Sequence, residues 1–444
     1  MAVPRSPDDL AAATPASRDR LIDLVRGASI VVVVLGHWTM AAFVRDLDGG
    51  VRVRNILEVA TWAHPLTWVL QVMPLFFFPA GFTNYLALTR PTTTVSAFVA
   101  GRAERVLRPT LLFTAIWMVA GNLAIALGAP AELLTAGGRA AAMVLWFLAV
   151  YLLITVLAPV QLRLHKRHPY LLVVALPVLT LALDRLQGTG WALAGFLTYV
   201  TVFAMCAELG HLYAEGRLSA IPRLAWGGIG AGAIAALLLL TVLGPYPVSM
   251  IGLPGQDTSN MMPPSVCVIA VAVLQTALVM IARPGLQRWL QRPRGWAGVV
   301  AVNTSVMTLF LWHLTALVLV AAAALGPLGV PLPVIGSGAW WLHKIVWIAV
   351  SSVVVIALVA AFSPAERLHA RAANRPGLMA MLGGGIAAVG LTMLACSGFI
   401  DPWVPGGIPL GGVQFRPGVG AALILLGWAL TRWPAPPSSE LARD

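Results

Sequence analysis

Two residues on one long apolar stretch carry side chains that could do chemistry. In RGASIVVVVLGH, residues 26–37, ten mostly apolar residues separate Arg26 from His37. In an α-helix that spacing leaves the two side chains about 20° apart around the axis and roughly 16 Å apart along it. A guanidinium can bind phosphate oxygens, and a neutral imidazole can accept a proton. Taken alone, Arg26 also suits a basic anchor paired with Asp23, and His37 suits a hydrogen-bonded core residue.

A second basic group lies in GRAERVLRPT, residues 101–110. Arg105 and Arg108 are three residues apart, so they share one face of a helix, and Arg102 adds charge one turn earlier. Such a row of guanidiniums suits a phosphorylated ligand, because each can form paired hydrogen bonds to phosphate oxygens. Anchoring of a helix end at the cytoplasmic surface explains the same cluster equally well.

The elements that must position these residues are membrane-spanning helices. Hydrophobic residues make up 59% of the 444 residues and charged residues only 10%, whereas soluble domains carry roughly 25% charge. We therefore predict an all-α fold, a polytopic membrane helix bundle of about twelve transmembrane helices. The expected spans are 20–44, 66–88, 108–128, 140–162, 169–184, 191–214, 224–244, 265–283, 298–325, 338–362, 378–399 and 417–433.

The basic residues predict how the bundle is oriented. Cytoplasmic loops collect Lys and Arg, and most of the 29 such residues fall in segments on the side of the N-terminus. Both termini are therefore expected in the cytoplasm, with residues 1–17 as a disordered tail, not a signal peptide, and residues 434–444 as a second tail. This placement explains the net charge of +12 without a nucleic-acid partner. High Ala, Gly and Arg usage suggests a bacterial source, hence the bacterial plasma (inner) membrane.

Sequence patterns of soluble enzymes are missing. We find no nucleophile elbow, zinc-protease helix, phosphate-binding loop or dinucleotide fingerprint. Cys206, Cys267 and Cys396 are isolated in apolar runs, which is typical of small core residues. No acidic cluster suggests a divalent ion, so no metal is expected. Glu208 and His211, three residues apart, are expected to form a structural ion pair.

Taken together, the motifs resemble acyltransferase family 3, integral-membrane acyltransferases that modify sugars and lipids at cell surfaces. The family's R-x10-H motif matches Arg26 and His37, and its RxxR motif matches Arg105 and Arg108. The segment MPLFFFPAGFTNYL (73–86) is similar to the family's LFFxxSGF segment.

Two further segments continue the resemblance in the same order. LWFLAVYLL (145–153) is similar to the family's Trp-Phe-Leu helix, and NTSVMTLFLWHL (303–314) to its late helix with a histidine. The likeness covers residues 18–362, which we predict as a ten-helix acyltransferase core. Residues 363–433 are then expected to be two additional C-terminal transmembrane helices.

The resemblance implies an acyl-coenzyme A donor bound from the cytoplasm, with acetyl-CoA as the expected form and no tightly bound cofactor. Its phosphates would meet Arg26, Arg105 and Arg108, and its thioester would reach the depth of His37. His37 would then act as general base on an acceptor hydroxyl. The acceptor would belong to a cell-surface glycan, glycolipid or glycosylated metabolite.

Several other residues are weaker candidates for the site. Trp146 could line the donor channel, although aromatic core packing explains it more simply. His313 lies mid-helix and could support the site or be a core residue. On the outer side, Asp257, Asn260 and His64 could hydrogen-bond a sugar acceptor, or belong to ordinary loops. Membrane lipids are a further expected partner of the bundle.

Two alternatives remain open from the sequence. Twelve helices with both ends inside also suit a secondary transporter or a flippase for a lipid or sugar-lipid, in which buried His and Arg couple protons. The departure at Pro79 and Ala80, where the family more usually has a small residue and Ser, also leaves room for a relative that only binds. Thioester cleavage separates an acyltransferase from both.

Overall fold

The structure is a computed structural model that describes residues 9, 12–15, 17–45, 51–253, 258–367, 377–401, 403, 404, 406–410 and 413–432. These residues are mostly helical, and ten helical segments among them are long and apolar enough to cross a membrane. The predicted multi-pass membrane protein is thus confirmed. Of the twelve spans expected, the two without a helix of that length fall on α8 (Leu171–Gln187) and α17 (Pro417–Thr431).

Two short hairpins depart from the all-α prediction. Strand β1 (Ala41–Arg45) pairs antiparallel with β2 (Val51–Asn55), and β3 (Gly406–Leu410) pairs with β4 (Val413–Phe415). In VRVRN, residues 51–55, apolar and charged side chains alternate with the two-residue period of a strand, whereas a helix buries one face every three or four residues. The hairpin directly follows the helix that carries His37.

The chain divides into two compact units, which are described separately: Met1–Tyr85 with Leu164–Leu358, and Leu86–Arg163 with Val359–Asp444. The helices assigned mainly to the first unit are α2 (Arg20–Met40), α3 (Thr67–Leu70), α4 (Met73–Leu88), α8, α9 (Ala192–Ala214), α10 (Arg217–Ala220), α11 (Arg223–Leu238), α12 (Val266–Leu290), α13 (Pro293–Asn303), α14 (Val306–Leu325) and α15 (Gly338–Arg367). The short 3₁₀ helices η1 (Ile56–Glu58) and η2 (Thr61–Leu66) and the π-helical turn η3 (Leu239–Leu243) connect or extend them. The second unit contains α5 (Val95–Ala126), α6 (Ala131–Ala142), most of α7 (Leu145–Arg167), α16 (Gly377–Ser397) and α17.

Helix α2 is fixed at both ends. At its start, Asp19 accepts hydrogen bonds from the backbone N–H groups of Leu21 and Ile22, as an N-cap residue does. At its other end the carbonyl of Ala41 accepts a hydrogen bond of 2.5 Å from Nζ of Lys344, on α15. Lys344 is buried, and its ammonium lies 4.8 Å from the ring centre of Trp340. A cation at this position stabilises α2, because the C-terminal end of a helix carries partial negative charge.

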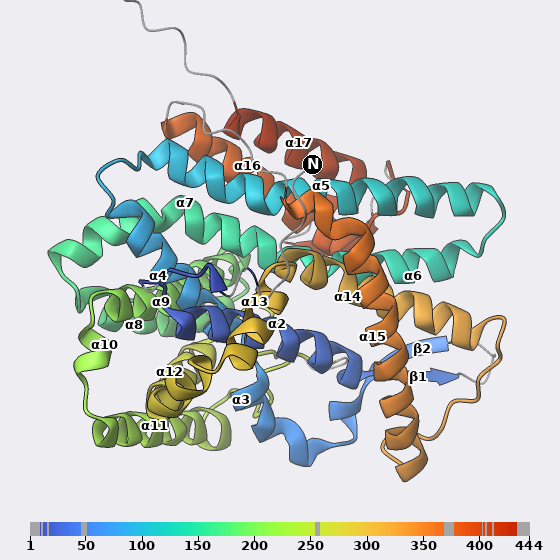
Figure 1. Ribbon diagram of the computed structural model, residues 1–444. Helices are drawn as coiled ribbons and strands as arrows, with labels where there is room; N and C mark the ends of the chain where they lie inside the picture. Colours follow the sequence, from blue (N-terminus) through green and yellow to red (C-terminus); the bar gives the residue numbers. More distant parts are fainter. Residues whose placement is uncertain are drawn as a thin grey trace, which may run out of the picture. The chain divides into compact units, whose positions relative to one another are not determined.

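Helices α4 and α9 approach each other at backbone distance (Figure 1). A Cβ atom on Gly81 would lie 1.9 Å from the carbonyl oxygen of Ala207, and one on Gly210 would lie 2.2 Å from that of Phe78. Only glycine fits at either position. Small residues that allow close backbone contact are typical of packed membrane helices.

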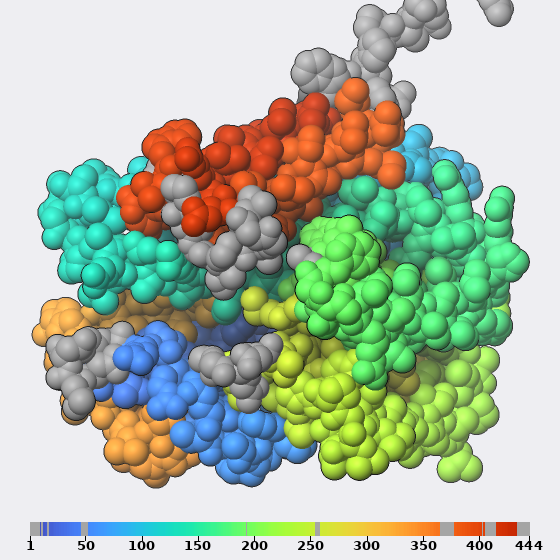
Figure 2. Space-filling model, turned by 180° about the vertical axis from the view of Figure 1, so that it is seen from behind, coloured from blue at the N-terminus to red at the C-terminus, as the bar shows by residue number. Residues whose placement is uncertain are grey.

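In the second unit, α16 and α17 form a tight pair that also packs against α5. Gly383 faces Gly427, and seven residues further along α16 Gly390 faces Gly420, so the backbones touch at two successive points. The indole of Trp428 donates a hydrogen bond of 2.9 Å to Glu104, on α5. Figure 2 shows α16 and α17, orange to red, lying side by side.

Candidate active site

A pair of histidines joins α2 to α14. Nδ1 of His37 lies 2.9 Å from Nε2 of His313, and the two ring planes are within 19° of each other. His313 is completely buried, whereas His37 keeps part of its surface exposed. The indole of Trp38 donates a hydrogen bond of 2.9 Å to the backbone carbonyl of His313, which fixes the register of the two helices at this point.

The hydrogen bonds of His313 assign the tautomers of both rings. Its Nδ1 lies 2.6 Å from the carbonyl oxygen of Phe310, which can only accept, so Nδ1 carries the proton. In the neutral ring Nε2 is then an acceptor, and His37 donates to it through Nδ1–H. This leaves the lone pair of His37 on Nε2, which has no hydrogen-bond partner among the described residues. A nitrogen in this state can take a proton from a bound hydroxyl group.

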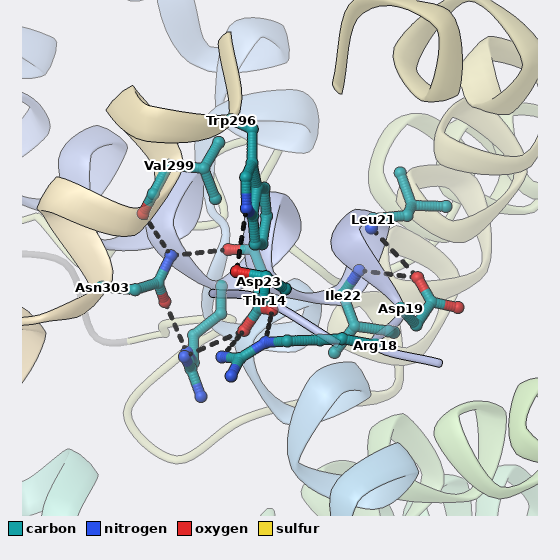
Figure 3. A network of polar contacts seen from close by, with 10 residues as sticks. Thr14, Arg18, Asp19, Leu21, Ile22, Asp23, Trp296, Val299 and Asn303 are labelled. Atoms are coloured by element: carbon teal, nitrogen blue, oxygen red, sulfur yellow. Dashed lines mark hydrogen bonds and ion pairs between the residues drawn. The ribbon is translucent and has the colours of Figure 1, made fainter. Parts of the chain in front are cut away.

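The cytoplasmic end predicted for α2 carries a network of polar contacts (Figure 3). Arg26 donates from Nε to Oδ1 of Asn303 at 2.7 Å and from Nη2 to Asp23 at 3.1 Å. Asn303, on α13, donates in turn to the backbone carbonyl of Asp23 at 2.9 Å. The pairing of Arg26 with Asp23 expected from the sequence is present, and 31% of the Arg26 side chain is still exposed.

Asp23 is shared between two arginines. It is buried, and it accepts from Nε and Nη2 of Arg18 at 2.5 and 3.0 Å as well as from Arg26. The hydrogen bond to Asp23 raises the pKa of Arg18 above its usual value. The two positive charges on one carboxylate leave a net positive end on α2. Along α2, Arg26 contacts α13 and His37 contacts α14, so the two side chains lie on the same side of the helix.

The other residues expected to bind the donor belong to the second unit. On α5, Arg105 is exposed and Arg108 is partly buried, while Arg102 donates a hydrogen bond of 3.3 Å to the hydroxyl of Tyr151. Trp146, near the start of α7, is partly buried with its ring edge-on to Phe147 at 6.1 Å. These side chains stay predictions as donor ligands.

The residues expected to meet an acceptor have local partners. Asn260 is buried; its amide donates to the carbonyls of Pro247 at 2.6 Å and Ser249 at 3.0 Å, and its side-chain oxygen accepts from Ser265. Its side chain thus holds the segment before α12 in place. Nε2 of His64, on η2, lies 2.9 Å from the carbonyl of Leu57. Asp257 lies outside the described residues, so acceptor binding stays a prediction for all three.

One cluster of titratable residues was only partly expected. Glu208 does pair with His211 at 3.2 Å, but the same carboxylate also lies 2.5 Å from Nδ1 of His165. All three side chains are completely buried and could together hold a metal ion. In the sequence His165 stands among Arg163, Lys166 and Arg167, so it looks like part of a basic anchor. Burial of one imidazole in that run is not visible from composition.

Comparison with protein families settles the relationship that the motifs suggested. A family model described as an acyltransferase domain matches residues 19–364. The chain belongs to acyltransferase family 3. The match to this family includes the whole of α2, α13 and α14, and ends before α16. Comparison with the curated proteins and with the solved structures finds no match.

Membership of acyltransferase family 3 identifies the chain as a membrane acyltransferase. Acyl transfer to a hydroxyl group needs a base that can take the hydroxyl proton. In the histidine pair on α2 and α14, one imidazole nitrogen of His37 keeps its lone pair, and a buried second histidine orients the ring.

Proposed function

We propose that the protein is an acyl-CoA-dependent O-acyltransferase in which His37 is the general base and His313 orients it. The acceptor hydroxyl gives its proton to Nε2 of His37 as its oxygen attacks the thioester carbonyl. When the tetrahedral intermediate collapses, the C–S bond breaks and the imidazolium returns the proton to the leaving thiolate. The products are an ester and free coenzyme A, and His37 is regenerated.

The tautomer of the histidine pair carries this proposal. A nucleophile's base is usually held in the correct tautomer by a third group, because only one nitrogen can face the substrate with its lone pair. Here the Phe310 carbonyl sets His313, and His313 sets His37. His313 is buried and keeps the imidazole of His37 from rotating. His37 itself is partly exposed, which leaves its Nε2 open to a substrate.

The donor in this proposal is acyl-CoA, with acetyl-CoA as the simplest case. Its phosphates would bind the guanidiniums of Arg26, Arg105 and Arg108, and Trp146 would line the path of the pantetheine arm. The net positive end of α2, where Arg18 and Arg26 share Asp23, supports a phosphorylated ligand there. About 16 Å of helix then separates Arg26 from His37, a distance that one extended donor arm can span.

We infer a topology with both termini in the cytoplasm and twelve spans, in which α8 and α17 cross as short helices. The acceptor would be a hydroxyl of a glycan, glycolipid or glycosylated metabolite at the outer face of a bacterial inner membrane. Asp257, Asn260 and His64 are the residues that we assign to that face.

Release of free thiol from acetyl-CoA tests the proposal. The full chain, purified in lipid nanodiscs, is given acetyl-CoA with a membrane glycolipid extract as acceptor. We expect turnover by wild type and a loss of about 10²–10⁴-fold in kcat for His37→Ala, which is the usual worth of a general base. The Arg105→Ala, Arg108→Ala double variant should instead raise KM for acetyl-CoA.

A matched control separates chemistry from folding. His343→Ala removes another partly exposed histidine of the first unit, one with no part in the proposed site, and kcat should stay near the wild-type value. No thiol release by folded wild type with acyl donors of two to sixteen carbons would overturn the proposal and favour transport. Equal activity in His37→Ala would remove His37 from the chemistry.

A further inference from the structure

A buried cluster at the ends of α7 and α9, separate from the histidine pair of the candidate active site, has the composition of a metal site. One ligand atom from each of His165, Glu208 and His211 lies within 4.8 Å of the other two. All three side chains have no exposed surface. Two imidazoles and one carboxylate are a common ligand set for divalent transition metals in proteins.

The hydrogen bonds within the cluster leave two ring nitrogens unused. Nδ1 of His165 and Nδ1 of His211 both face the carboxylate of Glu208, at 2.5 and 3.2 Å. Nε2 of each ring is buried and has no hydrogen-bond partner among the described residues. Buried polar atoms almost always have a partner, so two such nitrogens in one cluster point to a ligand that binds imidazole.

The surroundings supply an outer carboxylate for one of these rings. Nε2 of His165 lies 3.2 Å from Oε1 of Glu215, although not aligned as a hydrogen bond. Glu215 is held by Arg217 at 2.5 Å and accepts a hydrogen bond of 3.3 Å from the hydroxyl of Tyr85. A metal-bound histidine commonly donates its second N–H to such a carboxylate, which fixes the ring and strengthens the metal bond.

Charge also favours a cation inside the cluster. The carboxylate of Glu208 is completely buried, and an ionised group at that depth needs a compensating positive charge. A divalent ion bound by two neutral imidazoles would supply that charge to Glu208, whereas Glu215 is already paired with Arg217. Binding would also use at least one of the two unpartnered nitrogens.

We propose that His165, Glu208 and His211 bind one divalent transition-metal ion, for which Zn²⁺ is the best fit. With Zn–N and Zn–O bonds of about 2.0–2.2 Å, tetrahedral ligand atoms lie roughly 3.3–3.6 Å apart, so the three side chains must rearrange around the ion on binding. The bound ion would link His165, near the end of α7, to Glu208 and His211 on α9. This site is independent of the proposed acyl transfer and goes beyond it.

Metal content of the purified protein tests the site directly. The chain in lipid nanodiscs is stripped with chelator, equilibrated with Zn²⁺ and analysed by elemental mass spectrometry after gel filtration. We expect about one tightly bound Zn²⁺ per chain in wild type and less than a tenth of that in Glu208→Gln and His211→Ala. His168→Ala is the matched control, because His168 is exposed three residues from His165 and should not change the stoichiometry.

Two further measurements keep the test decisive if a variant fails to fold. Co²⁺ added to stripped wild type should give visible d–d bands of a nitrogen and oxygen site, bleached by excess Zn²⁺. His211→Cys, which keeps a zinc ligand, should retain the ion. Wild type without stoichiometric Zn²⁺ and without Co²⁺ bands, or Zn²⁺ retained equally in His211→Ala, would overturn the proposal. Neither readout depends on acyltransferase activity.

Discussion

Two pairs of histidines on helices of the first unit differ in the groups that their ring nitrogens face. In the pair on α2 and α14, His313 accepts from His37 and donates to a backbone carbonyl, with no acidic side chain in the chain of contacts. In the cluster on α7 and α9, both rings face one buried carboxylate, and a second carboxylate lies 3.2 Å from His165.

That difference separates two uses of the same side chain. A carbonyl fixes a tautomer without adding charge, so His37 stays a neutral base with one lone pair directed away from its partner. Carboxylates add negative charge, so the rings at Glu208 favour a bound cation, either a proton or a metal ion. Partial exposure suits the first use, because a substrate must arrive, whereas complete burial suits the second.

The largest effect that separates the regions is expected from Gly81→Ala. The added Cβ would lie 1.9 Å from the Ala207 carbonyl, and two backbones cannot move aside as a flexible side chain can. We expect the free energy of unfolding to fall by about 1–3 kcal/mol, as it does for other overpacked contacts. Thermal unfolding in detergent, followed by tryptophan fluorescence, measures it.

The control for this substitution is Gly228→Ala on α11, where an added Cβ meets no atom within 4 Å. That variant should unfold at the wild-type temperature or slightly higher, since alanine favours helix over glycine by about 1 kcal/mol. If the two variants unfold alike, the close contact of α4 and α9, one turn before Tyr85, does not exist as described.

His313→Leu sharpens the account of the first region and rests on the proposed function. Leucine fills space but cannot accept from Nδ1–H of His37, which leaves a buried donor unpaired at a cost of about 1–3 kcal/mol. If that cost appears in the transition state, kcat falls about tenfold to hundredfold, with KM for acetyl-CoA unchanged.

His313→Gln is the conservative partner, because its amide oxygen can still accept from His37. It should recover part of the lost kcat, which a purely structural role for His313 would not produce. A rise in KM with unchanged kcat in His313→Leu would contradict the orienting role and indicate a contact with substrate.

Much of the candidate site follows from local spacing. The eleven-residue interval predicts Arg26 and His37 on one face of a helix, and the three-residue interval predicts the pairing of Asp23 with Arg26. Family membership of residues 19–364 also follows from motifs that are short and ordered along the chain. Each of these depends on neighbours within about three helical turns, or on the order of segments.

Contacts between distant segments were beyond such reasoning. His37 meets a residue 276 positions away, and Asn303 bridges Arg26 to α13, because of how helices pack rather than because of any periodicity. His165 was missed because its run of basic neighbours dominates the composition. The hairpin after α2 has a usable signal in VRVRN, a short alternating segment that differs from the long apolar runs of spanning helices.

The smallest expected effect concerns Glu215, just beyond the end of α9. Although burial acts to raise it, the pKa of Glu215 is lowered overall by the hydrogen bond from Arg217 and by nearby positive charge. A carboxylate with a lowered pKa in the folded state stabilises that state above its unfolded value of 4.5, and the contribution is lost as the pH falls through the folded value.

Glu215→Gln should therefore lower the unfolding temperature at pH 6–7 by a small amount, corresponding to less than about 1 kcal/mol for a partly exposed pair. The gap to wild type should narrow below pH 4.5 and close as the pH falls through the lower pKa of the folded state, where the wild-type carboxylate is protonated too. Unfolding curves from pH 7 to pH 3.5 measure this, with Glu58→Gln, on the Arg54 pair at η1, as the comparison. A gap that is constant across this pH range would mean that Glu215 acts by shape alone, and that the carboxylate next to His165 brings no charge to the cluster.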